Sequence, residues 1–345
     1  MSCLHQLLQQ CAQQEPEYRG GLSSHLPMAL TALARMGATD ARLRQYALDY
    51  SQRLSPLASA PVPVPVPQTW QHLRGRIEAY PQLLAYFQQQ LKQQPQQPQQ
   101  PQQHPEQLVR HYLPQLMPGL GGAAFHGLLR LAYAMLNDCP EEIAAALAYF
   151  AARYLPLGQR LPQTGQFGSP QQLYQSLAGI DPALPPADLI FQSMQSASEL
   201  PDFAAQVASV RLDQDTLAAL AHAAVKLFLV KGNFVALHMV TACHALRLLL
   251  PYLDDPLEQA VPWLWQAQVA AFYAGKLGCQ AVSGVALLPD SAGTDIGDVQ
   301  SFAAKHAKDD HSIKMVFTCL EEGRFYGDAS HLWQRAAQKV CAAYG

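Results

Sequence analysis

Apolar residues recur at helical spacing along most of the chain. In residues 21–54 the recurring positions are Leu22, Leu26, Leu30 and Leu33. This spacing is typical of one buried face of an α-helix. Gly37 is a suitable end for that helix, and Thr39 with Asp40 is a suitable start for the next. The pattern therefore predicts two consecutive helices in this segment.

The same periodicity predicts helices through the rest of the chain. The expected helices are 106–112, 121–138, 139–155, 215–231, 233–253, 256–280, 297–322 and 328–343. Pro140 suits a helix start because its φ angle is fixed near the helical value, and Gly232 suits a joint between two helices. Residues 159–213 are interrupted by proline and glycine and predict loops with short helices. Because neither an alternating strand pattern nor an internal repeat is found, we predict an all-α fold.

Two segments of biased composition interrupt the helical pattern. Residues 58–68, ASAPVPVPVPQ, alternate proline with other residues and favour a stiff polyproline II connector. Residues 88–107, rich in glutamine and proline, lack the apolar side chains needed to fold and predict a mobile surface insertion. The piece before the insertion is short for a domain. We therefore interpret residues 1–345 as a single large helical domain with long irregular connections.

The composition is that of a chain that hides much of its surface. Hydrophobic residues make up 49% and charged residues only 14%, below the usual share of about 25%. The net charge of −3 gives no electrostatic reason to expect nucleic acid or an anionic membrane as a partner. The most apolar long stretch, 225–250, is interrupted by two lysines, two histidines and an arginine. Charges at that density predict a buried helix in a soluble protein, without a membrane span.

The cysteines and the first residues bear on the cellular compartment. Seven cysteines occur singly, without a CxxC pair. This spacing excludes a zinc ribbon and disfavours a disulfide framework. The first twenty residues lack the basic start and apolar run of a signal peptide. We therefore expect a cytoplasmic protein with reduced thiols.

Histidines are the main candidates for chemistry. Six lie in apolar segments predicted to be helical: His25, His126, His222, His238, His244 and His311. Each buried imidazole needs a partner for both ring nitrogens. Carboxylates are scarce in these segments, so a shared metal ion satisfies several imidazoles at once. A lone histidine in a helix is more often structural, but six in one chain favour a site.

The faces of two predicted helices separate these histidines further. His238 shares a face with small residues, whereas His244 lies about 120° round the helix from it. The two do not easily bind one ion, so His244 is expected to pack or hydrogen-bond nearby, with Arg247 on its side.

His126 and Arg130 are four residues apart on one face. His126 suits a ligand and Arg130 suits orienting an acidic group or a substrate oxygen, although a plain helix start with an exposed arginine explains them equally well.

The stretch KDDHSIKM, residues 308–315, concentrates charge in a chain that has little. His311 and Lys314 are three apart and share a helix face. A protonated lysine beside a cation is repelled. Lys314 is therefore expected to be neutral, turned outward to a carboxylate, or carbamylated into an anionic oxygen ligand. Asp309 and Asp310 suit a helix cap or a hydrogen bond to a ligand imidazole.

Several signatures of known enzymes are missing from the sequence. HExxH, ExxH and GxSxG do not occur, which removes support for a zincin, a ferritin-type di-iron site and an α/β-hydrolase. GLGGAA (119–124) matches GxGxxA, but no predicted strand precedes it. As a dinucleotide-binding fingerprint it is therefore very weak.

Four stretches together resemble the questin oxidase-like family. They are SSHLPMALTALARMGA (23–38), FHGLLRLAYA (125–134), KGNFVALHMVTACHALRLLLPYL (231–253) and DDHSIKMVFTCLEE (309–322). The family is mostly helical and includes enzymes that oxidatively open anthraquinone-type polyketides. The resemblance implies a mononuclear non-haem iron held by His25, His126, His238 and His311, with Lys314 as a further ligand in its carboxylated form.

The leading hypothesis is an oxygenase that uses Fe(II) and O₂ to insert oxygen into, or cleave a C–C bond of, an aromatic or quinone polyketide-like substrate. Arg130 and His244 are assigned to catalysis. The candidates for the cavity wall are Phe125, Tyr133, Phe234 and Trp263, although plain core packing is the safer interpretation of each.

A flavin- or NADPH-dependent Baeyer–Villiger-type monooxygenase without metal is a second hypothesis. A non-catalytic helical ligand-binding protein is the third, and the oligomeric state is left open.

Overall fold

The structure is a computed structural model that describes residues 1–58, 69–92, 104–279 and 296–344. Within these ranges the only sheet is an antiparallel pair of two-residue strands, β1 (Glu17–Tyr18) and β2 (Leu22–Ser23). Helices carry nearly all of the remaining regular structure, so the predicted all-α fold class is confirmed. Most of the predicted connector at 58–68 and residues 93–103 of the predicted insertion lie outside the described residues.

The helices of the first part of the chain follow the predicted pattern with shifted ends. They are α1 (Cys3–Cys11), α2 (Leu26–Arg35), α3 (Asp40–Ser51), α4 (Tyr80–Lys92), α5 (Pro105–Leu116), α6 (His126–Ala134) and α7 (Pro140–Ala152), with 3₁₀ helices η1 (Trp70–Leu73), η2 (Ile77–Ala79), η3 (Met117–Gly119) and η4 (Gly122–Phe125). The helix predicted from residue 21 begins only at Leu26, because the chain first forms the β1–β2 turn. The segment 88–107 begins within α4, which ends at Lys92, and ends within α5, which begins at Pro105. The predicted insertion therefore included residues that belong to these two helices. Thr39 caps α3 as predicted, since its hydroxyl accepts from the Arg42 N–H.

The second part of the chain contains the long apolar helices. The elements are α8 (Pro170–Ser176), α9 (Ile190–Ser198), α10 (Phe203–Ser209), α11 (Thr216–Lys231), α12 (Phe234–Leu249), η5 (Leu250–Tyr252), α13 (Pro256–Gln259), α14 (Val261–Ala274), η6 (Leu277–Cys279), α15 (Ile296–His306), α16 (Asp310–Tyr326) and α17 (Leu332–Tyr344). Gly232 adopts a left-handed conformation between α11 and α12, as the predicted joint requires. The single helix predicted over 297–322 is wrong: α15 ends at His306, and Asp309 caps a new helix by accepting from the Ser312 N–H at 2.9 Å.

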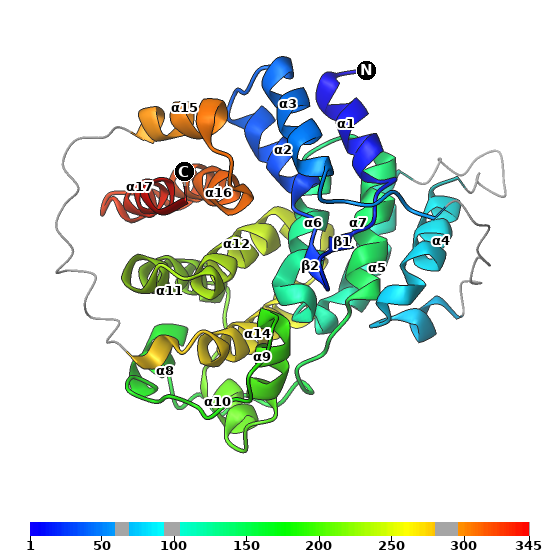
Figure 1. The fold of residues 1–345 in the computed structure, drawn as a ribbon. Coiled ribbons are helices and arrows are strands. Elements are labelled where there is room, and N and C mark those ends of the chain that lie inside the picture. Colours follow the sequence, from blue (N-terminus) through cyan, green and yellow to red (C-terminus); the bar gives the residue numbers. More distant parts are fainter. Residues whose placement is uncertain (59–68, 93–103, 280–295, 345) are drawn as a thin grey trace.

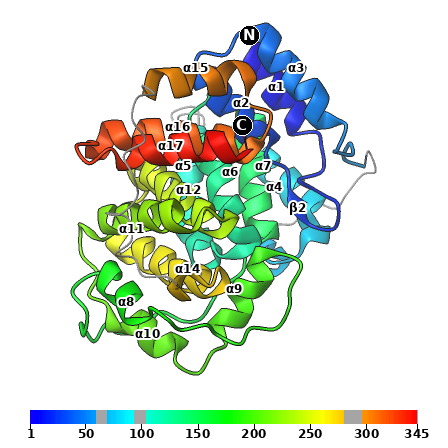
Figure 2. The same cartoon turned by 60° about the vertical axis from the view of Figure 1, so that its left-hand side comes forward.

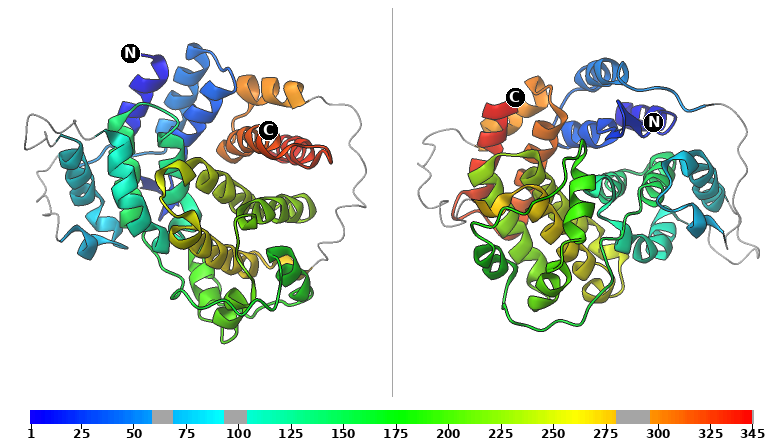
Figure 3. Two further views of the ribbon diagram at one scale, coloured as in Figure 1. Left: turned by 180° about the vertical axis from the view of Figure 1, so that it is seen from behind. Right: turned by 60° about the horizontal axis from the view of Figure 1, so that its bottom comes forward.

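Helix α12 lies at the centre of the helical layers. It packs against α11, α14, α16 and α6, with α16 and α17 stacked on one side and α14 on the other (Figure 1, Figure 2). Helix α2, near the start of the chain, packs against α16, near its end. The view from behind shows the blue helices α2 and α3 beside the orange and red helices of the C-terminal part (Figure 3). This arrangement brings residues from both ends next to the middle of α12.

One helical stretch among the described residues, Phe234–Tyr252, has the length and apolar composition to cross a membrane. It is 67% buried inside the protein. Burial of this kind is expected for the core helix of a soluble protein, and the packing of α12 against four neighbours explains its apolar character. The structure therefore supports the sequence-based expectation of a soluble protein.

A strained turn sets the start of α6. Ala123, Ala124 and Phe125 have φ angles of 46°, 51° and 72°, a left-handed conformation that costs non-glycine residues about 1–2 kcal/mol each. Gly122 precedes the turn at a point where a Cβ atom would lie 1.4 Å from the Arg153 carbonyl oxygen. The sequence GLGGAA thus forms a tight turn against α7, and no strand precedes it in the described residues.

We expect Gly122→Ala to destabilise the protein by about 3 kcal/mol, because the added methyl group must displace the backbone at Arg153. The free energy of unfolding measured in urea checks this. Gly168→Ala is the matched control, since a Cβ there would meet only the flexible Gln172 side chain at 3.4 Å. Its expected effect is within about 0.5 kcal/mol. Equal stabilities of the two variants would contradict the prediction.

Candidate metal centre

His25 stands between strand β2 and helix α2 and is held from two sides. Its backbone N–H donates to the Tyr50 hydroxyl at 3.0 Å. Its ring Nδ1 donates to Oδ1 of Asp310 at 2.7 Å. Pro27 fixes the first turn of α2 directly after it. The ring is therefore immobilised by residues from α3 and α16, and its Nε2 is left to face the interior.

His126 and His238 are oriented by backbone carbonyls. His126 opens α6, and its Nδ1 donates to the carbonyl of Ala123 in the strained turn. His238 lies in the second turn of α12, and its Nδ1 donates to the Phe234 carbonyl at 2.6 Å. A ring nitrogen that donates carries the proton in a neutral imidazole, so Nε2 of each ring carries the lone pair.

These three Nε2 atoms converge. Nε2 of His126 lies 2.6 Å from Nε2 of His25 and 3.3 Å from Nε2 of His238. Imidazoles bound to one ion at about 2.1 Å hold their nitrogens roughly 3–3.4 Å apart. Three lone pairs at such distances repel one another unless a cation lies among them. The 3.3 Å separation lies within this range, and the 2.6 Å separation is shorter than it. Because each Nδ1 donates its proton elsewhere, no proton is left for a hydrogen bond between the Nε2 atoms, and this tautomer favours a metal ion.

Burial keeps these imidazoles neutral. It lowers the pKa of His25 to about 4 against the opposing effect of Asp310. Burial and the neighbouring imidazoles also hold the pKa values of His126 and His238 well below the usual value. Metal ligands must be deprotonated, so these three rings are available to a metal ion across the physiological pH range.

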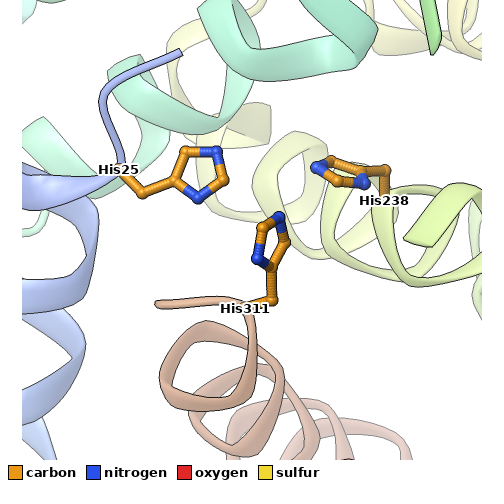
Figure 4. Close-up of side chains that lie close together, drawn as sticks. All are labelled: His25, His238 and His311. Atoms are coloured by element: carbon orange, nitrogen blue, oxygen red, sulfur yellow. The ribbon is translucent and has the colours of Figure 1, made fainter. Parts of the chain in front are cut away.

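His311 completes the cluster from the first turn of α16. Its ring centroid lies 4.6 Å from that of His25 and 5.4 Å from that of His238. The candidate donor atoms of these three histidines all lie within 4.8 Å of one another (Figure 4). Burial opposes a charge on His311, but Asp309 and Asp310 raise its pKa above the usual value. The ring thus comes from a separate helix and meets the others at the same point.

Asp310 connects two of these histidines. Its Oδ1 accepts from His25 and lies 2.9 Å from Nδ1 of His311. Burial opposes its ionisation, yet the two imidazoles hold its pKa well below the usual value, so it is a carboxylate. Asp309 caps the helix through Oδ1, and its Oδ2 lies 3.6 Å from Nδ1 of His311. Asp309 thus combines the two roles that the sequence suggested for this acidic pair, whereas Asp310 supports the histidines.

Lys314 lies beside the cluster with its ammonium group buried. The side chain is fully buried, and its Nζ has no hydrogen-bond partner among the described residues. Burial lowers its pKa to about 8, although Asp310 and Asp309 act in the opposite direction. The expectation that Lys314 turns outward to a carboxylate is therefore wrong. The other two alternatives, a neutral amine and a carbamylated side chain, stay open.

A cavity of about 300 Å³ opens in front of the histidines. His25, His126, His238 and His311 form its base. Its walls are mostly apolar and include Leu22, Leu189, Ile190, Phe191 and Phe234. Larger grooves of about 510 and 390 Å³ lie elsewhere, and the cluster lines neither. The cavity thus joins the candidate metal centre to an apolar binding space.

Sequence reasoning found only part of this wall. Phe234 lines the cavity as predicted, but Phe125, Tyr133 and Trp263 do not. Phe125 and Tyr133 are fully buried in the core, and Trp263 lines a different pocket. The segment 189–191, whose place in the wall was missed, lies at the start of α9 in the region predicted as loops with short helices. Its signal was three consecutive apolar residues in an otherwise polar stretch.

Arg130 and His244, assigned to catalysis from the sequence, do not line this cavity. The Arg130 guanidinium donates to both carboxylate oxygens of Glu142, at 2.7 and 3.0 Å. His244 donates from Nδ1 to Oε1 of Glu322 at 2.5 Å. Both the Arg130–Glu142 ion pair and the His244–Glu322 hydrogen bond are buried. The geometry does not support direct contact of either residue with a substrate, because each is already engaged with a buried glutamate.

A protein-family model matches most of the chain. The model described as Questin oxidase-like matches residues 22–319 of the 345-residue chain. The chain belongs to the questin oxidase-like family. The matched range includes all four converging histidines and Lys314, and membership indicates an oxidoreductase. No curated protein matches the chain.

We expect a divalent transition metal to stabilise the protein through these histidines. At a metal concentration roughly 100 times Kd the gain is about 2.7 kcal/mol, because the ion binds only the folded state. Thermal unfolding with and without Zn(II), and after a chelator, measures it. His238→Ala should abolish the shift.

The matched control is His222→Ala. His222 also lies in an apolar helix, but its Nδ1 binds the Ala218 carbonyl and its ring packs against Tyr326 and Trp333. This variant should keep the full metal-dependent shift. A shift that survives in His238→Ala, or is absent from the parent chain, would contradict the assignment.

We expect Asp310→Ala to weaken metal binding about 10- to 100-fold, since a ligand imidazole that loses its carboxylate partner is less basic and less well oriented. Competition with a chromophoric chelator measures the affinity. Asp328→Ala serves as the control and should keep the parent affinity, since this carboxylate accepts from the backbone N–H groups of Trp333 and Gln334 and belongs to none of the candidate metal groups of the described residues. Equal affinities of Asp310→Ala and the parent chain would show that the carboxylate does not support the site.

Proposed function

We propose that the chain is a non-haem iron-dependent oxygenase that acts on an aromatic or quinone substrate. The observation that carries the proposal is the convergence of three unprotonated Nε2 atoms, 2.6 and 3.3 Å apart, at the base of an apolar cavity. His25, His126, His238 and His311 would hold Fe(II), with Lys314 beside them. Family membership supports an oxidoreductase in the coarser sense.

The donor set fits iron. Neutral imidazole is a ligand for Fe, Zn, Cu and Ni, so the residues permit iron without selecting it. Fe(II), when bound, supplies the one-electron chemistry through which O₂ reacts with a closed-shell organic molecule. The apolar cavity wall supports the choice of iron over the other metals, because a site that opens into apolar space suits an organic substrate for oxidation.

The cavity would bind and orient the substrate. Leu189, Ile190 and Phe191 on one side and Phe234 on another offer flat apolar surfaces to an aromatic ring system. The Phe234 ring lies 4.6 Å from the His311 ring and extends this surface to the histidines. A bound ring system would exclude water from the reaction. We propose an aromatic small molecule and O₂ as the partners of this site.

Lys314 would serve the site as a neutral amine or as a carbamate. A protonated Nζ that is buried without a partner is unfavourable next to a metal cation. A pKa near 8 leaves a substantial neutral fraction at physiological pH. The neutral amine attacks CO₂ and loses one proton, which gives an anionic oxygen donor in place of a cation. Either form removes the unpaired buried charge.

The two rival hypotheses have less support. The GLGGAA stretch was the one sequence feature in favour of a dinucleotide, and it forms a strained turn packed against α7. A purely structural role for the histidines does not explain why three lone pairs meet. We also propose a cytoplasmic location. Free thiols in the described part of the chain support it: Cys3, Cys11, Cys139, Cys243, Cys319 and Cys341.

Substitution of Lys314 tests the proposal. Apoprotein should bind one iron per chain under anaerobic conditions and then consume O₂ in the presence of 1,8-dihydroxyanthraquinone. Lys314→Met should reduce this oxygen uptake at least roughly tenfold. The same variant should leave the metal-free protein equally or more stable, since it removes an unpaired buried cation.

The matched control is Lys339→Met. Lys339 is a partly buried lysine on α17, and its Nζ donates to the Leu229 carbonyl at 2.7 Å. This variant should keep the iron-dependent oxygen uptake. Purified protein that binds no transition metal, or uptake that is independent of iron, would overturn the proposed function.

A further inference from the structure

Beyond His311, polar side chains that do not line the cavity follow one face of α16. Lys314, Thr318 and Glu322 are spaced four residues apart, which places them above one another on a helix. All three are fully buried. At 1.5 Å per residue they span about 12 Å along the helix. A polar stripe of this length is unusual in a helix that packs against four neighbours.

Two further residues face this stripe from neighbouring helices. His244 of α12 donates from Nδ1 to Oε1 of Glu322. Tyr133 of α6 lies with its ring 6.1 Å from the His244 ring. The Thr318 hydroxyl is near enough to the Tyr133 hydroxyl to lower the pKa of that phenol against the dominant effect of burial. We call these five residues, Lys314, Thr318, Tyr133, His244 and Glu322, the polar column.

Each member of the polar column has a buried polar atom without a hydrogen-bond partner among the described residues. The atoms are Nζ of Lys314, Oγ1 of Thr318, the hydroxyl of Tyr133, Nε2 of His244 and Oε2 of Glu322. Buried polar atoms in native proteins are almost always satisfied. Leaving five unsatisfied would cost a large part of the net stability of a domain. Internal water molecules are the ordinary way to satisfy such groups.

The polar column has one end at the candidate metal centre and one near the surface. The charge of Lys314 acts on His25, His126 and His238, which places it at the inner end. At the outer end, Nε of Arg247 donates to Glu322 at 2.7 Å. The Arg247 guanidinium lies 4.4 Å from the ring of Phe325, a side chain that is 61% exposed. None of the five column residues lines the cavity.

We propose that the polar column, with internal water, carries protons between the metal centre and the protein surface. The inference rests on the proposed function, and it gives His244 and Glu322 a part in the reaction without contact with the substrate. A hydroxylated aromatic substrate loses a proton when its oxygen binds a metal ion. The substrate itself fills the cavity, so a proton released at the base needs a route outside the cavity.

The tautomer of His244 suits the transfer of a proton from the metal centre toward the protein surface. Its Nδ1 carries a proton and its Nε2 carries a lone pair. A proton leaving the centre passes along the hydroxyls of Thr318 and Tyr133 and bridging water, each of which accepts one proton and releases another. Nε2 of His244 accepts it, and Nδ1 releases its own proton to Glu322. The glutamic acid then loses that proton from Oε2, through internal water, to the surface near Arg247, and a flip of the His244 ring restores the starting tautomer.

Zinc-loaded protein and 4-nitrocatechol test the column without redox chemistry. Binding of the catechol to Zn(II) releases protons, which a pH indicator follows in a stopped-flow instrument. Tyr133→Phe and Thr318→Val each remove one hydroxyl and keep the shape of the side chain. Each should slow proton release at least fivefold while the affinity for 4-nitrocatechol and the zinc content stay unchanged.

Tyr174→Phe is the matched control. Tyr174 is equally buried, and its hydroxyl also has no partner among the described residues, but it packs on Trp265 and Phe272 outside the column. Its proton release should equal that of the parent chain. Equal rates in all variants would overturn the proton route and leave the proposed function intact. Failure to bind zinc, or failure of zinc-loaded protein to bind the catechol, would overturn the proposed function and the route with it.

Discussion

The mutual repulsion of unprotonated imidazole nitrogens is the constraint on which the centre of this molecule depends. Each Nδ1 of His25, His126 and His238 is committed to a carboxylate or a carbonyl, so each Nε2 presents a lone pair to the others. The surrounding helices hold these lone pairs together at a distance that only a positive charge makes favourable. This requires that α2, α6 and α12 each pack in the position that directs its histidine toward the other two.

Part of the free-energy cost of bringing these nitrogens together takes the form of backbone strain. His25 and His126 stand at helix starts, and His311 lies in the first turn of α16, where the direction of the chain can still be set locally. The three left-handed residues before His126 are the clearest case, because their strain presents the Ala123 carbonyl to the ring. Packing between α6 and α7 keeps the turn in place. Strain of this kind concentrates at functional sites, where the surrounding structure can overcome it.

Helical periodicity is a local signal, and it predicted the helical class. Residue chemistry indicated six candidate histidines, and the family resemblance implied the four that meet. Helix-face geometry also separated His244 from His238 correctly. The turn at Ala123 and Ala124 was missed, since alanine favours a helix and only tertiary packing overrides it. The wall at 189–191 was missed for a related reason. Which surface loop covers a cavity depends on how distant helices are arranged, and that information is not local.

The hydrogen bond between His25 and Asp310 joins residues 285 positions apart in the chain. Contacts of such long range form only after much of the intervening chain is ordered, because the entropy of closing the loop opposes them until then. We therefore expect the histidine cluster to form late in folding. An ion bound there would cross-link the N-terminal and C-terminal parts of the chain, and its loss would destabilise both parts together.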